Sequence, residues 1–177
     1  MIGKYIVASL ALLVSLTSAS SAWAADATGD KFIKEAIQGN LAEVKVGQLA
    51  QEKGASQGVK DFGATLATDH EAANQNATQA AQQMNVTPPG KPGLKHEAVY
   101  KKLSALSGEQ FDRQFAKDMV KDHKEDIAKY QQAAQQGGPA GDYAKQTLPK
   151  LREHLKMAQD LERNTQVAGA SESSKMQ

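Results

Sequence analysis

The stretch from Val59 to Met84, VKDFGATLATDHEAANQNATQAAQQM, decides the class of fold. Strong helix formers such as Ala and Gln dominate it, and no strand-like alternation of apolar and polar residues persists. Its apolar and small residues recur at spacings of three and four, which places them on one face of a helix: Val59, Phe62, Gly63, Leu66, Ala73, Ala77, Ala81 and Met84. At the middle of this apolar face lies one ionisable residue, His70. We therefore predict an amphipathic helix that brings a histidine into the protein core.

The same periodicity continues along the rest of the chain. Long helices are predicted over residues 30–53, 56–85, 108–136 and 140–164, and a short helix over 94–106. Long amphipathic helices bury their apolar faces most economically against one another. We therefore predict an all-α four-helix bundle as the one domain of the chain, over residues 25–164.

Several residues predict where these helices begin and end. Asp30 and Ser56 are predicted N-caps, and the S-x-x-Q sequence beginning at Ser107 predicts a capping box for the third long helix. Pro149 cannot donate a backbone hydrogen bond and predicts a bend in the last helix. The Ser-rich residues 165–177 have little to bury and predict a disordered tail.

The connection between the second and third long helices predicts the topology. Residues 85–107 are far more than an ordinary helix–helix turn requires. A connection of this length can run along the bundle, so that the two helices it joins are roughly parallel. This is the ferritin-like arrangement with one long crossover. We favour it over the alternative, a plain up-and-down bundle with an elaborated loop.

Each long helix places one ionisable residue on its apolar face, within about two residues of the helix midpoint, a distance of roughly 3 Å along the axis. In a bundle of helices of similar length the midpoints lie at one level. We therefore predict that four side chains meet in the core: Glu43, His70, His123 and His154.

A carboxylate and three imidazoles in a protein core allow two interpretations. An isolated buried carboxylate costs several kcal/mol unless it is paired, protonated or bound to a metal. Neutral imidazole nitrogens and a carboxylate oxygen are ligands for Zn, Mn, Fe or Cu, and zinc prefers four of them. We predict one mononuclear site for a divalent transition metal, with zinc as the first candidate. A structural polar cluster without metal is the alternative.

Acidic residues next to the helical histidines are further candidates for the site. An acidic residue precedes each helical histidine, namely Asp69, Asp122 and Glu153. Neighbouring helical residues diverge by about 100°, so each acid either reaches the histidine of another helix or lies in solvent. Asp126 is the best additional carboxylate, and His96 is predicted at the surface.

Composition and missing motifs exclude other functions. The 177-residue chain has no Cys, which excludes disulfides, iron–sulfur clusters and thiolate zinc sites. A net charge of +1 gives no case for nucleic acid as a partner. The residues three before the helical histidines are Ala67, Val120 and Leu151, so the Glu-x-x-His motif of di-iron carboxylate proteins is absent. No phosphate-binding loop or nucleophile elbow occurs either, and we predict no catalytic residues.

The first 24 residues predict a signal peptide. Lys4 precedes an apolar run of about 11 residues, and Ala22-Trp23-Ala24 has the A-x-A form of a signal-peptidase site. The run is shorter than the roughly 20 residues that cross a bilayer as a helix. We predict cleavage after Ala24, export to a bacterial periplasm and no stable membrane span. A retained membrane anchor is the alternative.

An ordered series of motifs runs from about Asp30 to Leu161: Leu41-Ala42-Glu43, Asp69-His70, Ser107-Gly108-Glu109-Gln110-Phe111-Asp112, Asp122-His123 and Leu148-Pro149-Lys150-Leu151-Arg152-Glu153-His154. In this series the chain resembles a bacterial family of unknown function, DUF4142. The resemblance implies an exported bundle with a ferritin-like fold and carries no known activity.

Two functions are therefore predicted. The first is a periplasmic metal-binding protein that handles metal or protects against stress. The second is a non-catalytic structural or interaction protein whose polar cluster fixes the register of the helices. The sequence identifies no protein partner.

Overall fold

The computed structural model describes residues 19–175 of the chain, and the side chains of residues 28–167. Most of the predicted signal peptide lies outside these residues. The described part folds into five helices and no strand, which confirms the all-α prediction: α1 Ala19–Lys53, α2 Gln57–Gln83, α3 Leu94–Ser104, α4 Gly108–Ala134 and α5 Gly138–Lys175.

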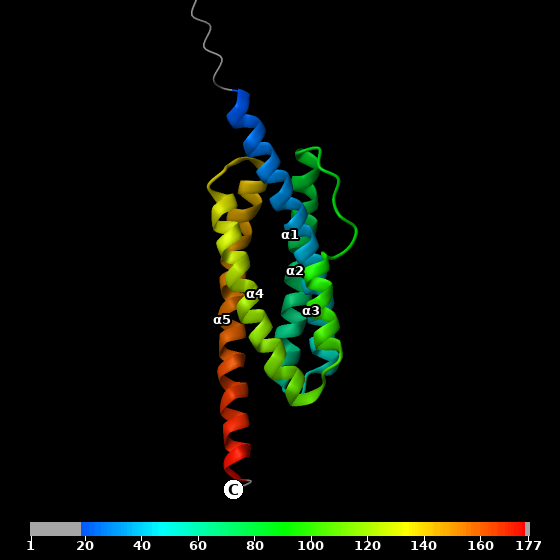
Figure 1. The fold of residues 1–177 in the computed structure, drawn as a ribbon, viewed down its shortest axis with the longest axis vertical. Helices are drawn as coiled ribbons and strands as arrows, with labels where there is room; N and C mark the ends of the chain where they lie inside the picture. Colours follow the sequence, from blue (N-terminus) through cyan, green and yellow to red (C-terminus); the bar gives the residue numbers. More distant parts are fainter. Residues whose placement is uncertain (1–18, 176–177) are drawn as a thin grey trace, which may run out of the picture.

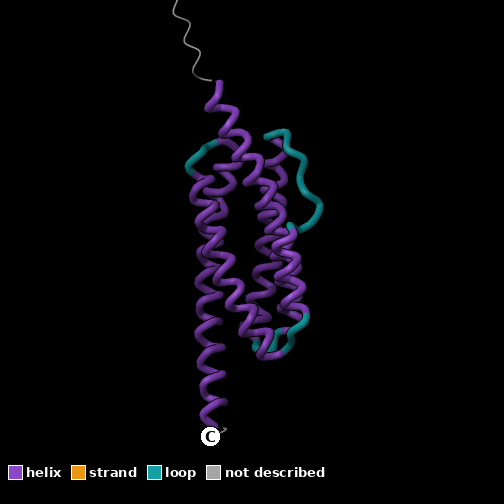
Figure 2. The backbone as a smooth tube through the Cα atoms, in the orientation of Figure 1, coloured by secondary structure: helices purple, strands orange, loops and turns teal. Residues whose placement is uncertain are grey.

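The four long helices form two antiparallel pairs, α1 with α2 and α4 with α5, and α3 lies along one side of the bundle (Figure 1). Figure 2 shows the long connection after α2 returning along the bundle to the start of α3. At one end of the bundle, α1 lies against the end of α2 and the start of α5. A Cβ atom built on Gly29 would lie 3.2 Å from Met84 Cε and 3.7 Å from Ala140 Cβ. At the opposite end, the α1–α2 turn contacts the start of α4. Consequently α2 and α4 run in the same direction.

This contact with α4 is made by a buried carboxylate. Asp112 accepts hydrogen bonds from the backbone N–H groups of Ala55 (2.9 Å) and Ser56 (2.8 Å). Ser56 itself is the predicted N-cap of α2, and its hydroxyl accepts from Val59 N at 3.4 Å. The turn between α1 and α2 is therefore attached to α4 by charge-assisted bonds.

Other predicted helix ends differ from the structure. Asp30 is not an N-cap, because α1 begins at Ala19 and continues through it. Ser107 precedes α4, but its side chain makes no capping hydrogen bond, so the predicted capping box does not form. The last helix is uninterrupted at Pro149 and continues to Lys175, whereas the sequence predicts an end near Asn164 and a disordered tail. Local helix propensity extends α5 beyond the point where it has a core to bury, since Val167 is 69% exposed.

Two apolar clusters form the core, one above the other along the bundle. The first includes Ile33, Ile37 and Leu151, and the second includes Phe62, Leu66 and Phe115. On each long helix, the residues of one cluster are separated along the sequence from those of the other. In that interval lie four of the buried polar residues: Glu43, His70, His123 and His154. A polar layer therefore divides the core at the predicted level.

Helices α1 and α2 approach so closely that their backbones touch at two glycines. A Cβ atom on Gly47 would lie 2.5 Å from the Gly63 carbonyl oxygen and 2.8 Å from Ala67 N. One on Gly63 would lie 2.6 Å from the Gly47 carbonyl oxygen. Since backbone atoms cannot move aside as a flexible side chain can, only glycine fits at both positions. This close contact holds Glu43 and His70 on neighbouring helices near the same level.

The Gly47→Ala variant is expected to lose about 3 kcal/mol of unfolding free energy, because its methyl group must push α1 away from α2. Gly39→Ala is the control on the same helix. The nearest atom to a Cβ there is His96 Nε2 at 3.9 Å, an ordinary contact, so this variant keeps or gains stability. Urea unfolding of both variants measures the difference. Equal stabilities would contradict the close helix contact.

Candidate metal centre

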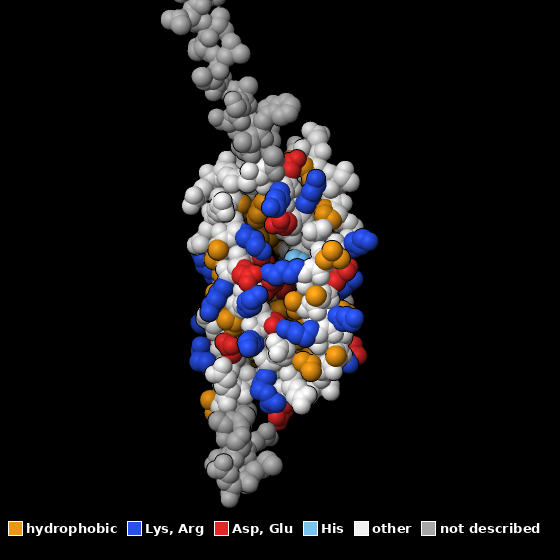
Figure 3. Space-filling view, viewed as in Figure 1, with side chains coloured by type: hydrophobic (Ala, Val, Ile, Leu, Met, Phe, Trp, Pro, Cys, Tyr) orange, Lys and Arg blue, Asp and Glu red, His pale blue; other side chains and the backbone are white. Residues whose placement is uncertain are grey.

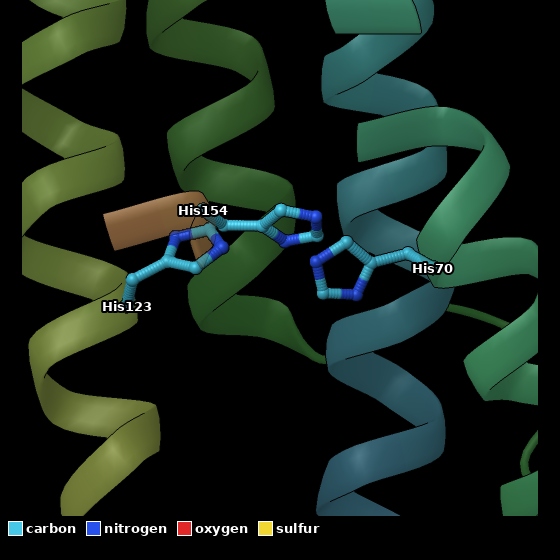
Figure 4. A group of neighbouring side chains, drawn as sticks. All are labelled: His70, His123 and His154. Carbon is cyan, nitrogen blue, oxygen red and sulfur yellow. The ribbon is translucent and has the colours of Figure 1, made fainter. Parts of the chain in front are cut away.

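Three histidines from three helices converge in the polar layer of the core. His70 from α2, His123 from α4 and His154 from α5 are 4%, 2% and 1% exposed. One ring nitrogen from each lies within 4.8 Å of the other two (Figure 4). The ring centroids are 5.3–5.9 Å apart. The structure thus brings together three of the four side chains that the sequence predicts.

On each ring, one nitrogen is held by an acceptor outside the cluster. His70 Nδ1 lies 3.0 Å from Asn40 Oδ1, and His123 Nδ1 lies 3.0 Å from the Met119 carbonyl oxygen. His154 Nε2 lies 2.8 Å from Asp69 Oδ2. Because all three partners are oxygen acceptors, the proton of each neutral ring belongs on the nitrogen that faces its partner.

The opposite nitrogens therefore carry lone pairs and no proton. These atoms, His70 Nε2, His123 Nε2 and His154 Nδ1, are buried and have no hydrogen-bond partner. Buried polar atoms are seldom left unsatisfied, and three such atoms in one cluster call for an explanation. Metal-bound histidines have this arrangement, in which the second ring nitrogen donates to an oxygen that fixes the ring.

Electrostatics keep the three rings neutral. Burial lowers the pKa of His70 well below its usual range, and the neighbouring His123 and His154 lower it further. Burial likewise lowers the pKa of His123 to about 4, with a further contribution from His154. The pKa of His154 is lowered by burial in spite of its hydrogen bond with Asp69. At neutral pH the cluster therefore presents unprotonated nitrogens, which is the form that binds metal.

Glu43 is buried in the same layer but does not belong to the group of three close nitrogens. Burial and the carboxyl groups of Asp122 and Asp126 raise the pKa of Glu43 well above its ordinary value. One of its oxygens, Oε2, has no hydrogen-bond partner. The fourth predicted ligand is thus a carboxyl group held in its protonated form beside other acids.

The flanking acids have different roles. Asp69 reaches the histidine of another helix, one of the two arrangements that the sequence allows, whereas Glu153 pairs with Lys150 at the surface. Asp122 interacts with Glu43.

A buried hydrogen-bonded network of polar side chains lies beside the site and was not predicted from the sequence. Asn40 is 2% exposed, and its amide nitrogen donates to the Tyr143 hydroxyl at 2.9 Å. That hydroxyl in turn lies 3.2 Å from the hydroxyl of Tyr130. This network fixes the Asn40 oxygen toward His70. The sequence could have identified Asn40 as part of the site, because it is a polar residue on an apolar helix face, three residues before Glu43.

These features define an all-helical bundle protein with a buried three-histidine cluster that could hold a metal ion. The chain belongs to the DUF4142 family, described as a domain of unknown function, whose profile matches residues 14–161. The resemblance inferred from the sequence motifs is therefore confirmed. A comparison with curated protein sequences finds no match.

Among solved structures, the chain is similar to one titled "Crystal structure of putative secreted protein DUF305 from Streptomyces coelicolor". The TM-score is 0.63 at 14% sequence identity, and the match covers 80% of this chain and 92% of the other. At this identity the similarity concerns the fold alone. No helix among the residues described here is long and apolar enough to cross a membrane.

Proposed function

We propose that this chain is an exported protein of ferritin-like architecture that binds one divalent transition-metal ion in its core. The ligands are His70, His123 and His154, with Glu43 as the fourth. One observation carries the proposal. Three buried ring nitrogens without a hydrogen-bond partner belong to rings that face one another (Figure 4), and the other nitrogen of each ring is fixed by an oxygen acceptor.

The spacing of the donors suits a four-coordinate ion after a small adjustment. Zinc–nitrogen bonds of about 2.0–2.1 Å place tetrahedral donors roughly 3.4 Å apart. The three nitrogens lie within 4.8 Å of one another, so modest tilts of the rings bring them to a shared ion. Zinc is our first candidate, because imidazole and carboxylate ligands in a tetrahedral site suit it; Mn, Fe and Cu use the same donors.

Charge supports Glu43 as the fourth ligand. A divalent ion among three neutral imidazoles in the core would leave two positive charges without compensation. Loss of the proton from Glu43 supplies one negative charge. The Asp69 carboxylate supplies a second, on the side of the His154 ring that faces away from the ion. The unpartnered Oε2 atom of Glu43 is the oxygen available for the ion, and the side chain must turn toward the rings to reach it, because it lies outside the group of three close nitrogens.

The proposed location is the bacterial periplasm, reached by cleavage of a signal peptide at residues 1–24. The secreted description of the structurally similar protein supports this proposal. In that compartment, a buried single-ion site suits metal handling or protection against metal stress. We assign no catalytic residue.

A structural polar cluster is the second candidate function. The hydrogen bonds from Asn40, the Met119 carbonyl and Asp69 hold the three rings without an ion. In this case the layer would serve only to align the four helices.

Metal analysis of the untagged protein, purified from the periplasm without chelators, tests the two candidates. We expect one equivalent of a transition metal per chain and a mature N-terminus at Ala25. Adding Zn²⁺ at 100 times its Kd to chelator-treated protein should stabilise it by about 2.7 kcal/mol and raise Tm by roughly 5–10 °C. A protein without metal, whose Tm does not respond to Zn²⁺, Mn²⁺, Fe²⁺ or Cu²⁺, would support the structural cluster instead.

A further inference from the structure

A cavity of about 380 Å³ opens between α1, the start of α3 and α4. It extends from the protein surface to His70, and its other lining residues include Gly39, Asn40, His96, Asp126 and Lys129. On the face in Figure 3, histidine atoms are visible near the middle of the bundle among acidic and basic side chains. The cavity thus connects solvent with one of the three buried rings.

His96 lies in the wall of this cavity at the start of α3. The sequence predicts it at the surface, but the side chain is half-buried, and its Nδ1 atom is buried without a hydrogen-bond partner. Close to it is Asp126, whose carboxylate is 19% exposed and bonded to Lys129 Nζ at 2.9 Å. An unpartnered imidazole nitrogen and a carboxylate therefore line the same space as His70.

We propose that this cavity is the route by which a divalent cation reaches the core, and that His96 and Asp126 bind the ion transiently on its way to His70. This inference rests on the proposed function. The three core histidines are at most 4% exposed, so an ion needs such a route. His70 is the core ligand that lines the cavity, and it is the first that an entering ion meets.

The order of events follows from the contacts. A hydrated cation displaces Lys129 from Asp126 and exchanges water for the free nitrogen of His96. It then passes to His70 Nε2, a ligand of the same kind, and on to the other two rings. Because His96 acts only on the path, it changes the rates of uptake and release together and leaves the equilibrium affinity unchanged.

Stopped-flow mixing of metal-free protein with Co²⁺, followed by absorbance, and with Zn²⁺, followed by competition with a dye, tests this proposal. The His96→Ala variant is expected to take up and release both ions about tenfold more slowly, with the stoichiometry kept and Kd within twofold of wild type. Lys101→Ala, an exposed position on the same helix, is the control and should keep the wild-type rates.

A second variant obstructs the cavity and leaves His96, Asp126 and the core ligands unsubstituted. A Cβ atom on Gly39 points toward His96, 3.9 Å from its Nε2 atom, so the Gly39→Leu side chain fills the space between them. We expect slower uptake at unchanged stoichiometry. Wild-type rates in both variants would overturn the proposed route, as would loss of the bound ion in His96→Ala, which would make His96 a permanent ligand. Failure of the wild-type protein to bind either ion would instead overturn the proposed function.

Discussion

The His123→Ala variant is expected to bind Zn²⁺ at least about 100-fold more weakly than wild type and to lose the rise in Tm that the metal gives. Loss of an outer partner of a metal-bound histidine alone costs 10–100-fold in affinity, so loss of a ligand costs at least as much. Two histidines and a carboxyl group at a buried site cannot replace the third nitrogen. Isothermal titration and thermal melts with and without Zn²⁺ measure both effects.

The control for this variant is Met119→Ala, one turn earlier on the same helix and equally buried. Each substitution leaves a cavity and costs about 2 kcal/mol or more without metal. The Met119 carbonyl keeps its helical partner when the imidazole is removed, so no new unsatisfied acceptor adds to the cost. Met119→Ala should still bind one ion. If His123→Ala binds Zn²⁺ as tightly as this control, the three histidines are a structural cluster.

The level of the site along the bundle could be predicted from the sequence, for a simple physical reason. Helical periodicity places Glu43, His70, His123 and His154 at the centres of apolar faces, and helices of similar length bring these centres together. The structure places all four between the two apolar clusters. The all-α class followed from the same periodicity.

The contacts within the layer could not be predicted this way, because a helical wheel gives an angle and not the reach of a side chain. It does not show that Glu43 lies beside Asp122 and outside the group of close nitrogens, or that Asp69 reaches across to His154. Nor does it predict that Asp112 binds a turn 56 residues away in the sequence. Such long-range pairs depend on how far each helix is displaced along its neighbour.

The affinity for Zn²⁺ is expected to depend on pH through Glu43 and not through the histidines. The pKa of His123 is about 4 in the metal-free protein, and those of His70 and His154 are lowered too. Protons therefore compete less strongly with the ion for these rings than for an exposed histidine, which begins to take up protons near pH 6.5. Glu43 has a raised pKa and must lose its proton to bind the ion. Wild-type affinity should therefore rise about tenfold per pH unit until the pH reaches the pKa of Glu43.

The Glu43→Gln variant separates these two contributions. Glutamine keeps the size of the side chain but has no proton to release and no charge to offer the ion. At pH 7.5 the variant should bind Zn²⁺ more weakly than wild type, and its affinity should change little between pH 7.5 and 5.5. Competition titrations against a chelator of known pH dependence give both profiles. Identical profiles would remove Glu43 from the ligand set. A fall of roughly a thousandfold per pH unit beginning near pH 6.5 would mean that the three histidines take up protons as exposed ones do, because each protonated ligand contributes a factor of about ten.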